Sequence, residues 1–331
     1  MRDMFNFEYQ KARSLMYKAI REFFDNRGYL EVFTPTLSPS LIPEPSIQNF
    51  SSRFENEFVC SKDMYLIPSP EIFMKELLAN GSGSIYQISS CFRNSEQLGD
   101  IHNPEFTMLE YYTVDADEID SIKLTEELLD AVAFETTDQA ARPPFIQLSV
   151  NEAMIKYANT NLDEVQDVEK LKARAEELGL YVPDNEPWDD TFNRIFINFV
   201  EPNLPTDKPV LLYDYPMQID CLAQKQEGKP YRKRWEAYIN GIEVANCYAE
   251  ETDKAKTKAY YEKEGARLRE ERANTSMPIP AASTSFPELS IPRSSGVAIG
   301  LDRLLAALLK LKEIEPLLLF PFTSLLKEDV K

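Results

Sequence analysis

The stretch from Ile85 to Tyr112 most constrains the fold of this chain, because it predicts two adjacent strands joined by a polar loop. Its first apolar run ends at Phe92 and Arg93. The second run begins at Pro104, and its alternation turns four side chains to one face of a sheet: Phe106, Met108, Glu110 and Tyr112. An aromatic surface and a carboxylate therefore share one face of the predicted sheet.

Side chains suited to chemistry gather around this strand pair. The planar guanidinium of Arg93 suits phosphate or carboxylate, because it donates two parallel hydrogen bonds. His102, the only histidine, lies in the connecting loop. The four steps from Phe106 to Glu110 cover roughly 13 Å, about the length of an aminoacyl-adenylate laid along the strand. The alternative is an ordinary strand pair with a buried Glu-Tyr hydrogen bond and a surface histidine, although these residue types fill a core poorly.

Three segments occur in a recognisable order: RGYLEVFTPTL (Arg27 to Leu37), FRN followed by HNPEFTMLEYY (Phe92 to Tyr112), and GVAIGLDRLLAALL (Gly296 to Leu309). They resemble motifs 1, 2 and 3 of the class II aminoacyl-tRNA synthetases, specifically the lysyl type. The resemblance covers nearly the whole chain. It implies an α+β fold, the class II catalytic fold, in which helices flank an antiparallel sheet.

Composition bounds the class of protein. The 331 residues are 43% hydrophobic and 11% aromatic, which is typical of a folded globular chain. No apolar run approaches ~18 residues and no signal peptide is evident, so we expect a cytoplasmic protein with no membrane partner. The four cysteines form no CxxC pair, which argues against a zinc knuckle and a disulfide framework. The net charge of -19 makes tRNA an unlikely partner, because nucleic-acid binders normally show a basic surface.

We expect a single catalytic domain over residues 1–331, with a mainly helical insertion at about 115–207. Helical patterns occur there at Ile119 to Val132, Val150 to Tyr157 and Val168 to Glu177. Near the N-terminus, residues 8–27 predict a helix and 29–33 a strand. The resemblance implies that they form a homodimer interface, with Pro35 set against the partner's site. From the residues alone, a helix docked on its own core is preferred.

Residues 38–50 contain three prolines and predict an extended loop that could cover the site. A helix is predicted after Ser69, with Ser69 as N-cap and Glu71 in the first turn. The resemblance implies that Glu71 holds the α-amino group of the substrate. The alternative is a carboxylate that only stabilises the helix N-terminus.

A second site element surrounds Asn240-Gly241, which predicts a two-residue hairpin within residues 234–253. In that register Tyr238 faces Glu243, so Glu236 and Glu243 project from the same face. Two such carboxylates can hold Mg2+, which prefers oxygen ligands and bridges nucleotide phosphates. The alternative is a solvated face with two unpaired glutamates.

The resemblance adds Asn246 and Glu250 as substrate contacts. Simple alternation turns these two side chains to the opposite face, so a bulge or bend after Ala245 is required. In the third motif, Ser295 to Gly300 predicts a strand, and Arg303 falls in the first turn of the next helix. A helix N-terminus and an arginine both favour phosphate. The alternative for Arg303 is a surface salt bridge.

The resemblance implies adenylation of an amino acid by ATP, with Arg93 and Arg303 as the catalytic residues. Arg93 would bind the α-phosphate and substrate carboxylate, and His102 with Arg303 the γ-phosphate. Phe106 and Arg303 would sandwich the adenine, with Glu96 or Asn103 near its amino group. Three residues would surround the distal ammonium of the substrate: Glu110, Tyr112 and Glu250.

Only seven residues precede the first predicted helix, where a lysyl enzyme carries an anticodon-binding OB-fold. We therefore expect no anticodon-binding domain. With the acidic charge, this resembles the truncated paralogues, the elongation factor P–(R)-β-lysine ligases, which also share Ala298 where lysyl enzymes have glycine. Elongation factor P is then the expected acceptor, and lysine or (R)-β-lysine the substrate. The methyl group of Ala298 is a plausible selector of the β-isomer.

The chain departs from the family pattern in the motif 2 loop. Ser95 stands where the family has glutamate, Glu96 comes one place later, and Ile101 replaces a basic residue. Two alternatives remain open. One is an enzyme that charges tRNA or another acceptor with lysine, and the other is a non-catalytic regulator that kept the synthetase fold.

Overall fold

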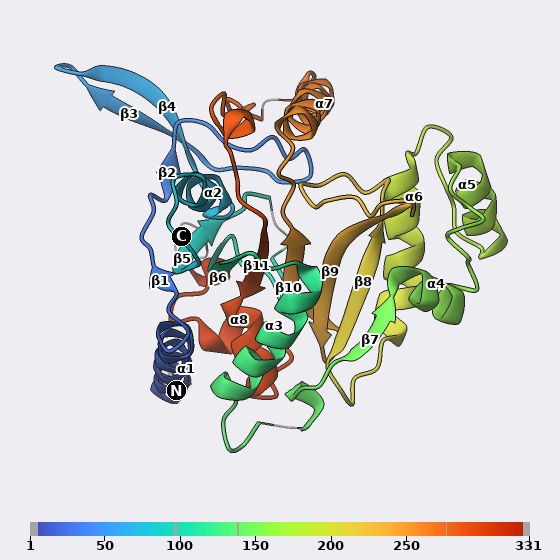
Figure 1. Ribbon diagram of the computed structural model, residues 1–331, viewed down its shortest axis with the longest axis horizontal. Helices are drawn as coiled ribbons and strands as arrows, with labels where there is room; N and C mark the ends of the chain where they lie inside the picture. The colour runs from blue at the N-terminus through green and yellow to red at the C-terminus, as the bar shows by residue number, and fades with distance from the viewer. Residues whose placement is uncertain (1–5, 96–97, 138, 276, 327–331) are drawn as a thin grey trace.

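The structure, a computed structural model, describes residues 6–95, 98–137, 139–275 and 277–326. Its centre is an eight-stranded sheet in the order β1-β5-β6-β11-β10-β9-β8-β7 (Figure 1). In that order the strands span Leu30–Glu31, Ile85–Phe92, Glu105–Val114, Ser294–Gly300, Ile242–Ala249, Tyr231–Ile239, Val210–Pro216 and Ile146–Ser149. The outermost pairs, β1–β5 and β7–β8, are parallel and the others antiparallel. The predicted antiparallel sheet flanked by helices is confirmed.

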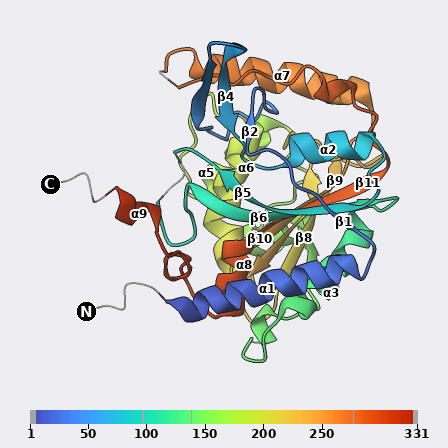
Figure 2. The same ribbon diagram turned by 90° about the vertical axis from the view of Figure 1, so that its left-hand side faces the viewer.

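Three helices cover one face of this sheet: α1 (Phe7–Asp25), α3 (Glu118–Val132) and α8 (Leu301–Leu308) (Figure 2). Their buried side chains, among them Phe24, Leu128 and Leu304, form one core with Tyr111 and Trp235 of the sheet. The amphipathic pattern predicted at the N-terminus is thus used for packing. The opposite face, below α2 (Glu71–Ala79) and α7 (Lys254–Arg272), is hollowed and is here called the open face.

A second core lies at the β7–β8 edge. It is built by α4 (Val150–Ala158), α5 (Val168–Glu177), α6 (Trp188–Ile195) and the following π-helical turn, Phe196–Val200. The predicted helical segments correspond to α3, α4 and α5, whereas α6 was not predicted. Because α3 packs on the central sheet, the helices of 115–207 divide between two cores. The boundaries of an insertion stay a prediction.

The remaining elements are short. A three-stranded sheet, in the order β2-β4-β3, comprises Leu37–Ser38, Cys60–Leu66 and Ser51–Asn56 and projects from the body (Figure 1). Helix α9 spans Phe322–Leu325, and 3-10 turns occur at Gln139–Ala141, Glu201–Asn203, Phe286–Glu288 and Glu315–Leu317. Pro70, rather than Ser69, precedes α2, and no side chain caps that helix, so the predicted serine cap is wrong. Among the described residues no helix is long and apolar enough to cross a membrane.

The hairpin of β9 and β10 has the predicted turn and one irregularity. Ile242 pairs with Ile239 and Glu243 with Tyr238, as predicted, but the register shifts between Glu243 and Ala245. The bulge therefore lies before Ala245 and not after it. A shift of one residue exchanges the two faces of a strand. As a result Asn246 lies opposite Glu236.

Candidate active site

Two adjoining hollows lie on the open face of the central strands. The arginine cavity, about 360 Å3, is lined by Arg93, His102, Asn103, Phe106, Glu236, Glu243, Asn246, Ala298 and Arg303, among others. The carboxylate pocket, about 100 Å3, is lined by Glu71, Glu110, Tyr112 and Glu250, and it shares Arg93, Asn246 and Ala298 with the arginine cavity. The structure thus brings the predicted site residues together, except Glu96, which lies outside the described residues.

Cross-strand pairing explains this arrangement. Glu110, Ala298, Asn246 and Glu236 form one row across β6, β11, β10 and β9. Directly opposed residues in antiparallel strands present their side chains on the same face. The bulge in β10 is what brings Asn246 into this row, so a backbone irregularity joins the hairpin to the other two motifs.

Arg93 lies where the two hollows meet. Its guanidinium carbon is 5.3 Å from the centroid of the Phe106 ring, and its backbone N–H donates to the Pro104 carbonyl at 2.9 Å. Its Nε is buried without a hydrogen-bond partner among the described residues. A buried, unpaired donor is costly unless a ligand supplies the acceptor. This orphaned N–H fits an anion at the junction.

Arg303 reaches the arginine cavity from the first turn of α8. Its Nε donates to the Ile101 carbonyl at 3.2 Å, and its Nη1 donates to the Glu243 carbonyl at 3.0 Å. The carboxylate of Glu243 lies 3.7 Å away. These contacts tie the motif 2 loop to the hairpin, and the salt bridge of Arg303 is made with a glutamate of the same cavity.

The loop before β6 contributes His102 and Asn103 to the same cavity. The Asn103 Nδ2 donates to the Glu105 carbonyl at 2.5 Å, and its Oδ1 accepts from the Phe322 N–H at 3.2 Å. Its amide therefore already fixes the loop against α9. Ser95, which stands in place of the family glutamate, has a positive φ of 56° and marks a turn in the lengthened loop.

Glu236 and Glu243 line the arginine cavity together, as the hairpin register predicts. Glu236 is buried, accepts from the hydroxyls of Tyr215 (2.5 Å) and Tyr238 (2.8 Å), and pairs with Arg234 at 2.5 Å. Burial and then the charge of Glu236 raise the pKa of Glu243 to about 7. The alternative of a solvated face with two unpaired glutamates is wrong.

The carboxylates of the arginine cavity determine whether it can bind a metal ion. Among the described residues no group of three or more metal-ligating side chains occurs. Two mutually repelling carboxylates that face one cavity still fit Mg2+, which keeps several waters and commonly takes one or two protein carboxylates with substrate phosphates. Glu236 and Glu243 would hold such an ion.

The carboxylate pocket is strongly acidic. Glu110 is 3% exposed, and its Oε2 accepts from the Tyr112 hydroxyl at 3.2 Å, the Glu-Tyr bond expected of an ordinary core. Here that bond lines a pocket, because Glu71 and Glu250 approach from α2 and from the end of β10. Burial, and then Glu71, raise the pKa of Glu110 well above its usual range. Burial raises that of Glu250 to about 7.

Lys75 is a residue that sequence reasoning missed. Its side chain is 1% exposed, and its Nζ lies 2.5 Å from both Glu71 Oε1 and Glu250 Oε2. Burial alone would lower its pKa, but the charges of Glu250 and Glu71 outweigh that effect and raise it. The available signal was the Glu-Lys spacing of four on a helix, which usually marks a surface pair.

Gly296 is a second missed residue. A Cβ at this position would overlap Glu250 Oε1 and the ring of Tyr112, so only glycine lets these side chains approach the strand. Ala298, two residues on, has room for its methyl group beside Glu110 and Asn246, its partners across the sheet. Glycine and alanine in β11 therefore shape the floor of the pocket.

The proline-rich loop also borders the site. Glu44 and Ile47 line the carboxylate pocket, and Gln48 forms a bridge with Asn94 of motif 2. The Asn94 N–H donates to the Gln48 carbonyl at 2.8 Å. The expectation that residues 38–50 form an extended loop over the site agrees with this position.

Comparison with known proteins places this geometry in a family. Residues 2–324 match the tRNA synthetases of class II (D, K and N). The chain belongs to this family. This class II synthetase is 35% identical over 319 residues to the elongation factor P–(R)-β-lysine ligase of Hamiltonella defensa subsp. Acyrthosiphon pisum (strain 5AT), covering 93% of each chain. It is also 35% identical over 313 residues to the Proteus mirabilis (strain HI4320) protein of that name, covering 91% of each.

Another relative is a tRNA ligase. The lysine–tRNA ligase of Clostridium perfringens (strain SM101 / Type A) is 31% identical over 326 residues. That match covers 93% of this class II synthetase but 63% of the tRNA ligase. The chain therefore matches the elongation factor P ligases over their length and the tRNA ligase over part of its length.

Proposed function

We propose that this chain is a ligase that activates (R)-β-lysine or lysine with ATP and transfers it to a lysine side chain of elongation factor P. The relatives named elongation factor P–(R)-β-lysine ligases, matched over 91 to 93% of their length at 35% identity, support the acceptor and the lysine-type substrate. The observation that carries the proposal is the junction at Arg93. There a pocket of four carboxylates opens into a cavity lined by guanidiniums.

The first step joins an amino acid to a nucleotide. A substrate carboxylate oxygen attacks the α-phosphorus of ATP, a new P–O bond forms, and pyrophosphate leaves. Most of the rate must come from positioning and charge neutralisation. Arg93 would hold the α-phosphate and carboxylate, Arg303 and His102 the γ-phosphate, and Phe106 the adenine. Bound Mg2+ would neutralise phosphate charge beside Glu236 and Glu243.

The carboxylate pocket would select the amino acid. The distal ammonium of the substrate would be surrounded by Glu110, Tyr112 and Glu250. Its other amine would be bound by Glu71. Lys75 already pairs with Glu71 and Glu250, so a neutral side chain of similar size would leave the buried Glu110 without an ion-pair partner. Asn246, whose Oδ1 is buried without a partner among the described residues, supplies an acceptor between the two hollows.

The second step transfers the activated carboxyl. The acceptor amine nitrogen, after losing a proton, attacks the carbonyl carbon. A C–N bond forms, the C–O bond to AMP breaks, and the nitrogen releases its second proton. The product is an amide on the acceptor, together with AMP.

Pyrophosphate exchange tests the first step without an acceptor. We expect exchange with (R)-β-lysine or lysine, and Arg93→Ala should reduce it at least ~100-fold, because removing a preorganised donor costs about 3 kcal/mol. Arg27→Ala is the matched control, since Arg27 pairs with Glu127 at 2.8 Å, outside both hollows. Exchange that survives Arg93→Ala at the wild-type rate would place the site elsewhere.

Mass spectrometry tests the second step. Elongation factor P incubated with the enzyme, ATP and (R)-β-lysine should gain the mass of one lysyl group. The relationship to the Clostridium perfringens lysine–tRNA ligase favours a second candidate, in which tRNA accepts lysine. Labelled lysine in acid-precipitable tRNA, with unmodified elongation factor P, would establish that alternative.

We also propose a homodimer. Four large apolar side chains on and beside α1 and β1 are exposed, at 56 to 81% of their surface: Phe7, Leu15, Leu30 and Phe33. Exposed apolar side chains on neighbouring elements favour an interaction surface. Pro35, two residues after Phe33, is also exposed. Light scattering should give twice the chain mass, and Leu15→Glu with Phe33→Glu should reduce it to one chain.

A further inference from the structure

A third cavity, here called the outer acidic cavity, adjoins the site and has a volume of about 410 Å3. It shares Glu71, Glu236 and Glu243 with the two hollows described above. Its other walls come from residues 42–46, from α6 and its π-helical extension, from residues 219–222 and from α7. Among the described residues, nine carboxylates and two guanidiniums line it.

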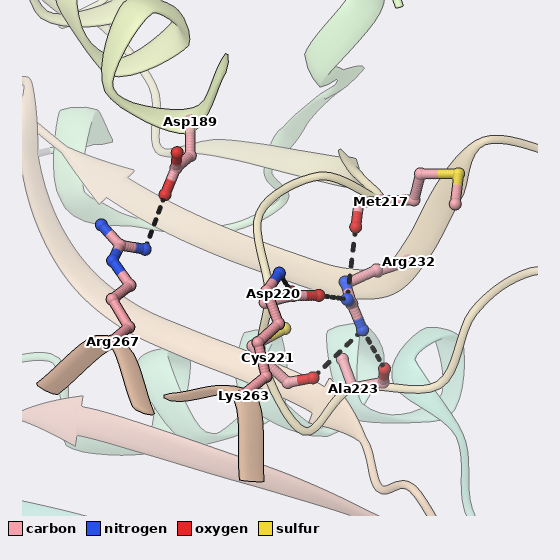
Figure 3. A network of polar contacts seen from close by, with 8 residues as sticks. All are labelled: Asp189, Met217, Asp220, Cys221, Ala223, Arg232, Lys263 and Arg267. Carbon is pink, nitrogen blue, oxygen red and sulfur yellow. Dashed lines mark hydrogen bonds and ion pairs between the residues drawn. The ribbon is translucent and has the colours of Figure 1, made fainter. Parts of the chain in front are cut away.

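Ion pairs connect these walls, so the cationic side chains nearby already have carboxylate partners (Figure 3). Arg267 of α7 donates to Asp189 of α6 at 3.0 Å. Asp220 pairs with both Arg232 of β9 and Lys263 of α7. Of the two guanidiniums that line the cavity, Arg267 therefore belongs to Asp189, and Arg234 belongs to Glu236.

Four carboxylates of the cavity have no cationic partner within ion-pair distance among the described residues: Glu44, Asp190, Glu201 and Glu264. Glu264 is 4% exposed, and its Oε1 is buried without a hydrogen-bond partner in that same part of the chain. Burial raises the pKa of each of the four, that of Glu44 to about 7. A carboxylate that lacks a cationic partner and is buried, as Glu264 is, favours a cation from outside.

The shape and charge of the cavity narrow the class of cation. The described residues offer no cluster of three or more metal-ligating side chains, which disfavours a second metal ion. A polyanion such as tRNA would be repelled by the excess of carboxylates. A long side chain that ends in an ammonium satisfies both constraints, because it can extend along the walls and place one charge beside Glu264.

We propose that the outer acidic cavity admits the lysine side chain of the acceptor protein and leads its amine to the activated carboxyl group. The inference rests on the proposed function and adds the route by which the acceptor enters. Glu264 and the rim residue Asp190 would attract the ammonium. Glu71 and Glu243, which line both this cavity and the site, mark where the route ends.

Activation of the amino acid and its transfer to the acceptor can be measured separately. The two measurements distinguish entry of the acceptor from the adenylation step. Glu264→Gln and Asp190→Asn should leave pyrophosphate exchange within about twofold of wild type, because neither residue lines the arginine cavity or the carboxylate pocket. Both should lower kcat/KM for transfer to elongation factor P, Glu264→Gln by at least ~10-fold, since it removes a buried charge from the route. Glu262→Gln, an exposed change on the same helix, is the matched control and should not alter transfer.

Each outcome decides one proposal. Normal transfer by both variants would refute the route and leave the proposed function standing. Faster charging of tRNA by the variants than by wild type would also refute it, since the cavity would then admit a polyanion. If wild type shows no exchange, the proposed function fails. Calorimetric binding of Nα-acetyl-lysine amide then decides the cavity alone, because Glu264→Gln should weaken that binding and an unchanged affinity would overturn the route.

Discussion

The ammonium of Lys75 lies 2.5 Å from the carboxylate of Glu250, and the lysine side chain is almost completely buried. This pair joins α2 to the end of β10, and Glu71 completes it from the first turn of α2. The pocket therefore contains its own cation before any substrate arrives. Two carboxylates that a substrate amine would meet are already held in place by a lysine.

Replacing this lysine should damage stability and substrate binding together. Lys75→Met keeps the length of the side chain but leaves Glu71 and Glu250 without their cation, and breaking a buried pair typically costs about 3–5 kcal/mol. Urea unfolding should report a loss of that order, and KM for the amino acid should rise more than KM for ATP. Lys11→Met removes an exposed pair with Glu8 and should change little. Equal stability of the two variants would contradict the buried pair.

Glu243 gives a pH dependence whose sign follows from its pKa of about 7. The folded state holds this proton more tightly than the unfolded state, whose glutamates titrate near about 4.3. Its contribution to stability is therefore complete below about pH 4.3 and is lost as pH rises toward 7. Between these pH values, the melting temperature of Glu243→Gln should fall less with rising pH than the melting temperature of wild type.

The same residue predicts a response to Mg2+. Above pH 7 the ionised Glu243 should bind the cation together with Glu236, so Mg2+ should raise the melting temperature of wild type and not that of Glu243→Gln. In exchange assays the variant should need more Mg2+ for half-maximal rate. An identical Mg2+ requirement in both proteins would remove Glu243 from the metal site.

Ala298 should help to choose between α-lysine and β-lysine. Its methyl group lines both hollows, between Glu110 and Asn246. A methyl group in a tight pocket is worth about 1–3 kcal/mol of discrimination, so Ala298→Gly should improve activation of α-lysine relative to β-lysine by roughly 10- to 200-fold. The ratio of the two kcat/KM values is the measurement, because lost stability lowers both. A constant ratio would make Ala298 a packing residue.

Gly296 should tolerate no side chain. The Cβ of Gly296→Ala would overlap Glu250 and Tyr112, so the variant must displace the carboxylate, the ring or β11 itself. We expect loss of amino-acid activation with ATP binding retained, measured by exchange and by nucleotide titration. Gly300→Ala is the control, since its Cβ would approach no atom nearer than Arg303 Cδ at 3.8 Å. Normal activation by Gly296→Ala would contradict the close approach.

Local periodicity was sufficient to predict much of the site. Alternation in β6 predicted that Phe106 and Glu110 share a face, and the Asn-Gly turn predicted the pairing of Tyr238 with Glu243. Both depend only on near neighbours in the sequence. The resemblance of three motifs then supplied the order in which distant segments meet.

Features that depend on distant packing were not predictable in this way. The Glu71 and Lys75 spacing is that of a surface pair, and only the approach of Glu250 from β10 makes it buried. Helix α6 was missed, although its Trp188 and Phe192 lie in the second core. The position of the bulge was wrong by a residue or more, because alternation does not reveal which residue of Val244 and its neighbours is the extra one.

The extra residue in β10 also determines how this enzyme tolerates changes in length. Glu243 and Asn246 are three positions apart, so a regular strand would send them to opposite faces of the sheet. Both line the same cavity because the backbone gains one residue between them. Deleting Val244 would remove no proposed ligand, yet it would split the phosphate half of the site from the amino-acid half. In β10 the number of residues, as well as their identity, determines which side chains reach the cavity.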